Sequence, residues 1–249
     1  MTSATAHSGL GLEQNLFNFY TLVCGGIFIF APGVPVAGTW PDLSGEALDI
    51  AKVYAQVVGF LMWQALSTQC PGPRGLQMAM FAIIGGMCYH IFALGIYPPT
   101  PVMVGCGIVL ASTFWSGMTS KDKHESSLSR SCFMLWNLIQ AFTFYQTRQS
   151  GTGTPAISDS YPNIVQIPGA LEATDVWCEV IATMSLMLVL LQCPGPLGRA
   201  MAMTANVGLA YYHFSKGIMP PPPVVLLSGS SCMLSWYTYF TVSAKSKAA

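Results

Sequence analysis

Residues 69–80 read QCPGPRGLQMAM, and residues 192–203 read QCPGPLGRAMAM. Nine of the twelve positions are identical, at a constant offset of 123 residues. In both stretches a Cys-Pro-Gly-Pro motif stands between apolar segments. Because proline fixes φ and lacks an N–H, it suits the start of a helix and disfavours the interior of one. The two stretches therefore predict two tight turns, each of which joins two helices.

The similarity continues on both sides of these turns. The further matches are Tyr89-His90 with Tyr212-His213, Gly95-Ile96 with Gly217-Ile218 after one deletion, and Asn15-Leu16 with Asn137-Leu138. A match of this length at one spacing indicates an internal duplication. We therefore expect a first repeat at residues 1–120, a basic linker at residues 121–130 and a second repeat at residues 131–249.

The composition indicates which solvent surrounds the protein. Hydrophobic residues make up 52% of the chain and charged residues only 8%, whereas about 25% of a typical soluble domain is charged. So little charge predicts a surface that faces lipid. The ten basic and ten acidic residues balance, and no basic stretch is present to bind phosphate backbones. Nucleic-acid binding is therefore excluded as a function class.

A membrane-spanning helix needs about 20 mostly apolar residues. Segments that approach this length are 16–31, 50–69, 76–96, 101–119, 131–147, 174–192, 200–219 and 224–242. Two longer loops are expected at 32–49 and 148–173. The sequence thus predicts an all-α polytopic membrane protein with eight transmembrane helices. They form two parallel four-helix bundle repeats, because an even number of spans inserts both copies in one direction.

The basic residues predict the orientation of this bundle. Eight spans place both termini on one side, together with both Pro-Gly-Pro turns and the linker. Seven basic residues lie on this side: Arg74, Lys121, Lys123, Arg130, Arg199, Lys245 and Lys247. Three lie on the other: Lys52, Arg148 and Lys216. By the positive-inside rule, we expect the termini on the cytoplasmic or matrix side.

The second copy carries a characteristic order of residues: Glu179, the turn at 193–199, His213, Gly217 and the prolines at 220–223. This order resembles the DoxX-like superfamily of four-helix membrane proteins, and the resemblance covers nearly the whole chain, once per half. It implies a link to quinones, since the superfamily includes subunits of a thiosulfate:quinone oxidoreductase. Other relatives act as membrane chaperones, and most are single four-helix units.

The first copy departs from this pattern at two positions. It has Gln56 where the second copy has Glu179, and Leu76 where the second copy has Arg199. A function that needs that acid and that base can survive only in the second half.

His90, His213 and Glu179 are the candidate cofactor-binding residues. An ionisable side chain inside a membrane is costly to bury and suggests a function. The histidines could bind haem iron or a pigment, or hydrogen-bond a quinone or lipid, and the carboxylate could serve a proton or quinol site. The alternative is that each neutral imidazole bonds a neighbouring helix and stabilises packing. No catalytic residue and no metal site are predicted, and the eight cysteines resemble small apolar packing residues.

These features favour a non-catalytic accessory or scaffold subunit of a respiratory electron-transport complex, with the mitochondrial inner membrane as its location. Other subunits and membrane lipids are the expected partners, and a quinone or structural lipids the expected ligands. One alternative is a quinone-linked oxidoreductase component, of the thiosulfate:quinone type, that uses His213, Glu179 and Cys193. Two others are a pigment-binding photosynthetic subunit and a small-solute transporter, the latter disfavoured by the scarcity of midplane charge.

Overall fold

The computed structural model describes residues 11–70, 73–96, 100–119, 127–149, 161, 163–193 and 195–248. These residues are all-helical, without a strand among them, which confirms the predicted fold class at this level. A helix lies at each of the eight predicted segments. The helices are α1 (Gly11–Phe30), α3 (Gly45–Ser67), α4 (Pro73–Cys88), α5 (Thr100–Thr119), α6 (Ser127–Gln149), α8 (Ala170–Leu190), α9 (Pro196–Ser215) and α10 (Pro222–Ala248).

Three short elements were not predicted. They are α2 (Gly33–Thr39), the π-helical turn η1 (Tyr89–Ala93) and the 3₁₀ turn η2 (Ile164–Gln166). The prediction of one loop over residues 32–49 was therefore wrong, because α2 and the first turn of α3 lie within it. The apolar residues Pro35 and Val36 of α2 are buried. Burial of this kind stabilises a short helix such as α2, which helix propensity alone does not stabilise.

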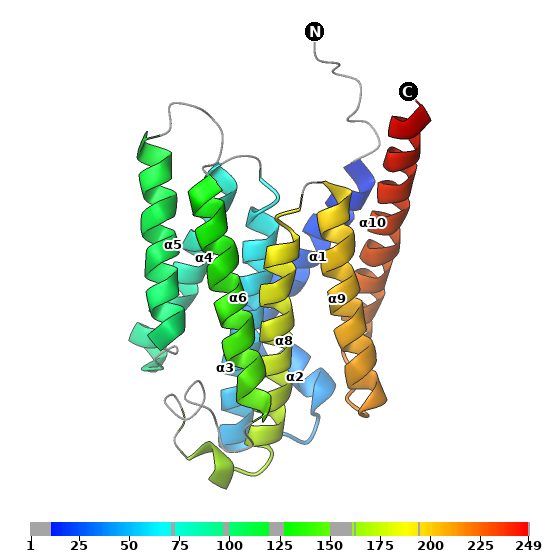
Figure 1. Ribbon diagram of the computed structural model, residues 1–249. Coiled ribbons are helices and arrows are strands. Elements are labelled where there is room, and N and C mark those ends of the chain that lie inside the picture. Colours follow the sequence, from blue (N-terminus) through cyan, green and yellow to red (C-terminus); the bar gives the residue numbers. More distant parts are fainter. Residues whose placement is uncertain are drawn as a thin grey trace.

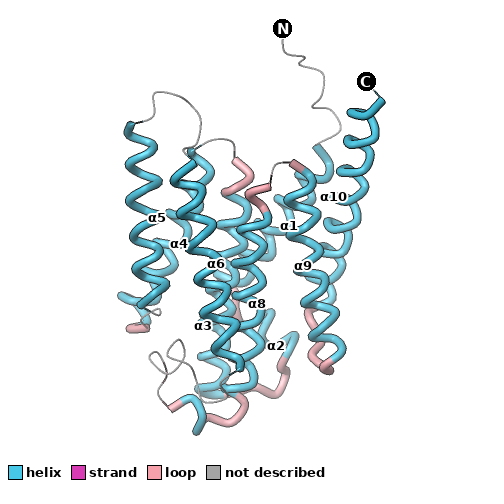
Figure 2. The backbone as a smooth tube through the Cα atoms, in the orientation of Figure 1, coloured by secondary structure: helices cyan, strands magenta, loops and turns pink. Residues whose placement is uncertain are grey.

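The long helices lie side by side, with α3 and α8 at the centre (Figures 1 and 2). These two helices pack against each other, and both bury small side chains, among them Ala51 and Ala55 of α3 and Ala173 and Ala182 of α8. Small residues let two backbones approach closely. Around this centre, α1 contacts α3 and α10, α6 contacts α8 and α5, α4 contacts α3 and α5, and α9 contacts α8 and α10.

The helices alternate in direction along the chain. The start of α1 and the end of α10 lie at the same end of the bundle, at the top of Figure 1. The end of α8 and the start of α9 lie at that end too, whereas α2 and η2 lie at the opposite end. We call these the terminal end and the loop end.

The last turn of α9 shows why this helix stops where it does. Gly217 has a φ of +78°, a left-handed conformation that suits glycine. Its N–H donates to the carbonyl of Phe214 at 3.0 Å, and the N–H of Ile218 donates to the carbonyl of His213 at 3.0 Å. These two bonds form a Schellman motif, which ends the helix and satisfies two of its last carbonyls.

The corresponding segment of the first half, from His90 to Ile96, is one residue longer than the segment from His213 to Ile218. There the N–H of Ile96 donates to the carbonyl of His90 at 2.9 Å, although six positions separate this pair and only five separate Ile218 from His213. The extra residue falls where the chain forms the π-helical turn Tyr89–Ala93. A π turn bonds each N–H to the carbonyl five residues earlier and so accommodates one inserted residue. The deletion seen in the alignment thus has a structural counterpart.

Substitution of Gly217 by alanine is expected to lower the stability of the folded chain by about 1–2 kcal/mol, because an L-residue is strained in the left-handed region. Gly208, inside α9, provides the control: a Cβ there would meet no atom within 4 Å. Gly208→Ala is expected to leave stability unchanged or raise it by about 0.5–1 kcal/mol. The thermal midpoint of both variants, followed by circular dichroism in detergent, would check this. Equal midpoints would contradict it.

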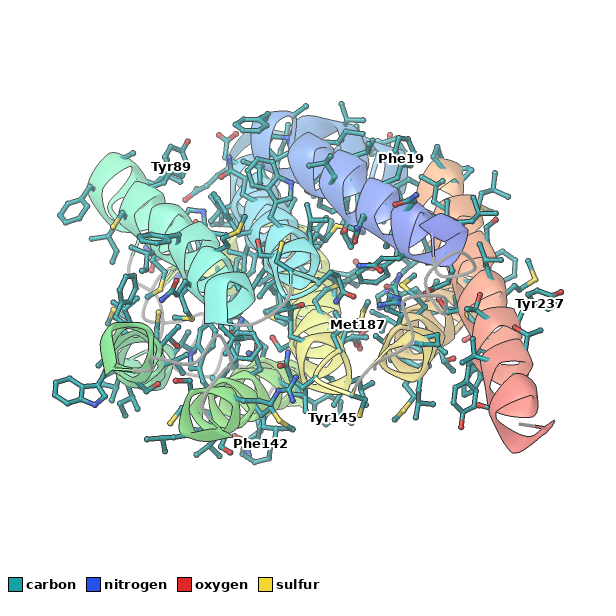
Figure 3. All side chains as sticks on the ribbon, turned by 90° about the horizontal axis from the view of Figure 1, so that it is seen from above. Phe19, Tyr89, Phe142, Tyr145, Met187 and Tyr237 are labelled. Carbon is teal, nitrogen blue, oxygen red and sulfur yellow. The ribbon has the colours of Figure 1, made fainter. Side chains whose placement is uncertain are left out.

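The outer surface is strongly apolar. In the view along the bundle, Met187 lies inside, whereas Phe19, Phe142 and Tyr237 lie at the rim (Figure 3). These three aromatic side chains are 52%, 61% and 67% exposed, respectively. Extensive exposed apolar surface marks contact with a membrane or a partner.

Two described helical segments, Gly75–Ala93 and Ala170–Leu190, are long and apolar enough to cross a bilayer. Helices α1 and α2 count as a third span if they are taken together, although they meet at an angle of 95°. These features are compatible with an integral membrane protein.

Candidate functional site

Glu179 and His213 form a direct contact between α8 and α9. Nε2 of His213 lies 2.6 Å from Oε2 of Glu179, and the two side chains are only 6% and 9% exposed, respectively. A heavy-atom separation this short is typical of a hydrogen bond that involves a charged group. Two of the three predicted site residues therefore lie in one place.

The turn between α8 and α9 explains this meeting. Gly195 of the turn lies 16 residues after Glu179 and 18 residues before His213. Since each residue of a helix adds about 1.5 Å, two antiparallel helices bring residues at such distances to about the same height. Gly195 has a φ of +70°, and Pro196 occupies the first turn of α9. The turn thus fixes both the reversal of the chain and the register of the pair.

His90, the third predicted site residue, lies elsewhere and in a different environment. It is buried, and its ring meets the ring of Phe60 edge-on at 6.2 Å between centroids. Its Nε2 has no hydrogen-bond partner within the described part of the chain. Gln56, the counterpart of Glu179, donates instead to the carbonyl of Ile29 at 3.1 Å. The structure therefore does not bring the first-half pair together.

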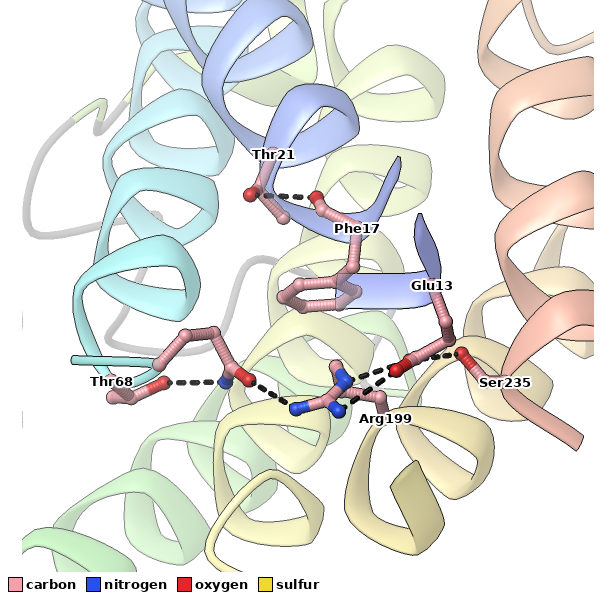
Figure 4. A network of polar contacts seen from close by, with 7 residues as sticks. Glu13, Phe17, Thr21, Thr68, Arg199 and Ser235 are labelled. Atoms are coloured by element: carbon pink, nitrogen blue, oxygen red, sulfur yellow. Dashed lines mark hydrogen bonds and ion pairs between the residues drawn. The ribbon is translucent and has the colours of Figure 1, made fainter. Parts of the chain in front are cut away.

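A second buried ion pair, between Glu13 and Arg199, was missed in the sequence. Arg199 is 6% exposed and Glu13 only 1%. The guanidinium donates through Nε to Oε1 of Glu13 at 2.6 Å and through Nη2 to Oε2 at 2.8 Å (Figure 4). This bidentate geometry is the strongest form of Arg–carboxylate contact.

Two further side chains complete this network. Ser235 donates to Oε1 of Glu13 at 2.8 Å, and Arg199 donates through Nη1 to Oε1 of Gln69 at 3.0 Å. The network thereby ties α1, α9 and α10 to the end of α3. Arg199 thus contacts Glu13 and Gln69, whereas Glu179 contacts His213, so the acid and the base that distinguish the second copy have different partners. One signal in the sequence pointed to Glu13: it is the sole acid before Asp42 and adjoins an apolar run.

An open groove adjoins the Glu179–His213 pair. It has a volume of about 530 Å³ and lies between α6, α8 and α9. Glu179 and Thr183 line it from α8, Phe142 and Tyr145 from α6, and Tyr212 from α9. A volume of this size is within the range of ligand-binding pockets.

His213 borders a second and smaller cavity of about 90 Å³, with Trp177 and Asn206 in its wall. Since one water takes about 30 Å³, this cavity is large enough for a few waters at most.

Metal chemistry finds no support among the described residues, where no cluster of three or more His, Cys, Asp or Glu side chains occurs. The eight cysteines are unpaired, and Cys24, Cys106 and Cys178 are buried. These three behave as the small apolar packing residues that the sequence predicted. Cys193 is partly buried.

Comparison with known proteins adds no further evidence: no family model, curated protein or solved structure matches this chain.

Proposed function

We propose that this chain is a non-catalytic accessory or scaffold subunit of an energy-transducing membrane complex of the respiratory type. The observation that carries the proposal is how its buried polar groups are used. Glu13, Arg199 and Ser235 bind one another across three helices, and Asn206 donates to Tyr20 from α9 to α1 at 2.9 Å. Such contacts specify how helices assemble in lipid.

The apolar rim supports the same proposal from outside. Side chains such as Phe92 on η1, Leu226 on α10 and Trp115 on α5 are 84%, 70% and 67% exposed. A surface of this kind can face lipid or other membrane subunits.

Extraction in a mild detergent, followed by native electrophoresis and mass spectrometry of the band, tests this function. The chain is expected to migrate with a complex several times its own mass of 26.7 kDa. Fractionation of the cells that produce the protein tests the mitochondrial inner membrane as its location. Migration as a lone monomer from every membrane fraction would refute the accessory role.

We further propose eight transmembrane helices in two parallel repeats, with the termini on the cytoplasmic or matrix side. The contacts between the long helices support the repeats, since α1–α3, α3–α4 and α4–α5 have the counterparts α6–α8, α8–α9 and α9–α10, and α1–α10 mirrors α5–α6. Arg199, which is buried in an ion pair, no longer counts as a free basic residue at the terminal end. Six basic residues against three still favour this orientation.

A protease-accessible epitope placed after Ala249 tests the orientation in sealed vesicles of known sidedness. Cleavage is expected only when the cytoplasmic or matrix face is outside. Cleavage only from the opposite face would reverse the proposed topology.

The second candidate is a quinone-linked oxidoreductase component, as the DoxX-like resemblance implies. The contact between Glu179 and His213 favours it, because a carboxylate–imidazole pair can exchange a proton with a bound quinol. Purified protein would then contain a quinone and support redox turnover that His213→Ala abolishes. A preparation without redox-active small molecules and without turnover would exclude this candidate.

A further inference from the structure

Three residues that line the groove beside Glu179 have counterparts of different size in the first half. Thr183 and Leu186 line the groove from α8, and the residues 123 positions earlier are Phe60 and Trp63. Leu209 lines it from α9, and its counterpart is Gly86. Two aromatic side chains and one glycine in the first half thus correspond to smaller side chains and one leucine in the second.

These aromatic side chains occupy the space that corresponds to the groove. Phe60 reaches from α3 to α4, where a ring carbon would lie only 2.7 Å from a Cβ on Gly86. Trp63 reaches from α3 to α1, donates to the carbonyl of Leu22 at 3.2 Å and covers Gly25. Phe60 and Trp63 thus fill space between α3 and its neighbours α4 and α1, the helices that correspond to α8, α9 and α6.

The polar side chain at this place also differs between the two halves. The first half has the neutral Gln56, which bonds a backbone carbonyl, whereas the second half has Glu179 held by His213. An ionised carboxylate only accepts hydrogen bonds. Glu179 lines this groove, and its carboxyl oxygens can accept a hydrogen bond from a molecule that brings an O–H or N–H donor.

The other residues that line the groove indicate the chemistry of the rest of the bound molecule. Leu138, Phe142 and Leu186 line the groove and are 45%, 61% and 40% exposed, so the groove opens onto the apolar outer surface. In an integral membrane protein this surface faces acyl chains. The occupant thus arrives from the bilayer with an apolar chain.

We propose that the groove between α6, α8 and α9 binds a membrane amphiphile whose apolar chain lies along Leu138, Phe142 and Leu186 and whose head group donates an O–H or N–H to Glu179. His213 acts as a positioning residue that holds the carboxylate toward this head group. The proposal rests on membrane insertion, and it holds whether or not the chain belongs to a larger complex.

Native mass spectrometry of the full chain in detergent tests this with two probes, 1-hexadecanol and its methyl ether. The two differ only in the hydroxyl donor. The wild type is expected to take one alcohol and to prefer it over the ether by about tenfold, the effect of one charge-assisted hydrogen bond. Equal binding of the two probes would overturn the role of Glu179, and binding of neither would overturn the site.

Three variants transplant first-half residues into the groove. Leu186→Trp and Thr183→Phe each place a larger side chain in it, as Trp63 and Phe60 stand at the corresponding positions of the first half. Both are expected to reduce the alcohol adduct at least about tenfold. Glu179→Gln, which copies Gln56, is expected to bind the alkyl chain of both probes but to prefer the alcohol less strongly, because an amide oxygen accepts the hydrogen bond without a charge.

Leu226→Trp on α10 is the matched control, because Leu226 is 70% exposed and lies outside the groove. It is expected to bind both probes like the wild type. Should Leu186→Trp fold poorly, Thr183→Phe still tests the groove. An unchanged alcohol adduct in a folded, filled variant would overturn the proposal.

Discussion

Replacement of Arg199 by leucine is expected to lower the free energy of unfolding by about 3–5 kcal/mol. The change leaves the carboxylate of Glu13, which is 1% exposed, buried without its cation. Ser235 still donates one hydrogen bond to it, but a single neutral donor contributes only about 1.5–3 kcal/mol to a charged group. Unfolding of the detergent-solubilised chain with increasing denaturant, followed by circular dichroism, measures the loss.

The double variant Glu13→Leu/Arg199→Leu is expected to recover most of that loss. An apolar pair of similar volume often replaces a buried ion pair at little cost, because it removes both desolvation penalties together. Leucine already stands at the two corresponding positions, Leu76 and Leu135. A double variant as unstable as the single one would show that the network contributes more than charge compensation.

The control for this pair is an exposed one. Lys52 lies 3.0 Å from Asp49 on the same helix, and the two side chains are 35% and 74% exposed, respectively. Lys52→Leu is expected to change stability by at most about 1 kcal/mol, because solvent screens such a pair.

The second large effect is a contrast between the two histidines. His213→Leu is expected to cost about 3–5 kcal/mol, since it removes a short polar contact of the buried Glu179. The same change at His90 is expected to be neutral or slightly stabilising, because it removes a buried polar ring and breaks no hydrogen bond at Nε2 among the described residues. Both variants have the same change of side chain and are measured by the same denaturation experiment.

The stability of His90→Leu tests whether His90 has a partner of its own. A loss as large as that of His213→Leu would indicate that His90 has a partner of equal strength, such as a bound ligand. Only the second half carries an acid at this position, so the sequence already favoured His213 over His90 as a chemical site. The structure adds the contact between His213 and Glu179, and it places Phe60 beside His90.

Much of the fold was accessible without coordinates. Apolar runs, proline breaks and the duplicated turn predicted a helix at each of the eight segments. These signals are local, since they depend on how a short stretch of backbone meets water or lipid. The helix α2 escaped prediction because its apolar side chains gain stability only from the core that they pack against.

The candidate site was predicted in part, and for a physical reason. Glu179 and His213 meet because they stand at nearly equal distances from one tight turn, which is a property of the sequence. Glu13 and Arg199 are 186 positions apart, and no local spacing relates them. Their contact depends on how α1 and α9 pack.

The duplicated turn at residues 69–80 and 192–203 determined by itself that the chain repeats one helical plan. The repeated motif could not show how side chains fill the space between the helices of each half. Phe60 and Trp63 fill this space in one half, and a carboxylate with an open groove distinguishes the other. Whether a side chain fills a space or leaves it open depends on the neighbouring helices. Only the tertiary structure shows this difference, because packing depends on contacts between helices. The periodicity of a sequence describes one helix at a time.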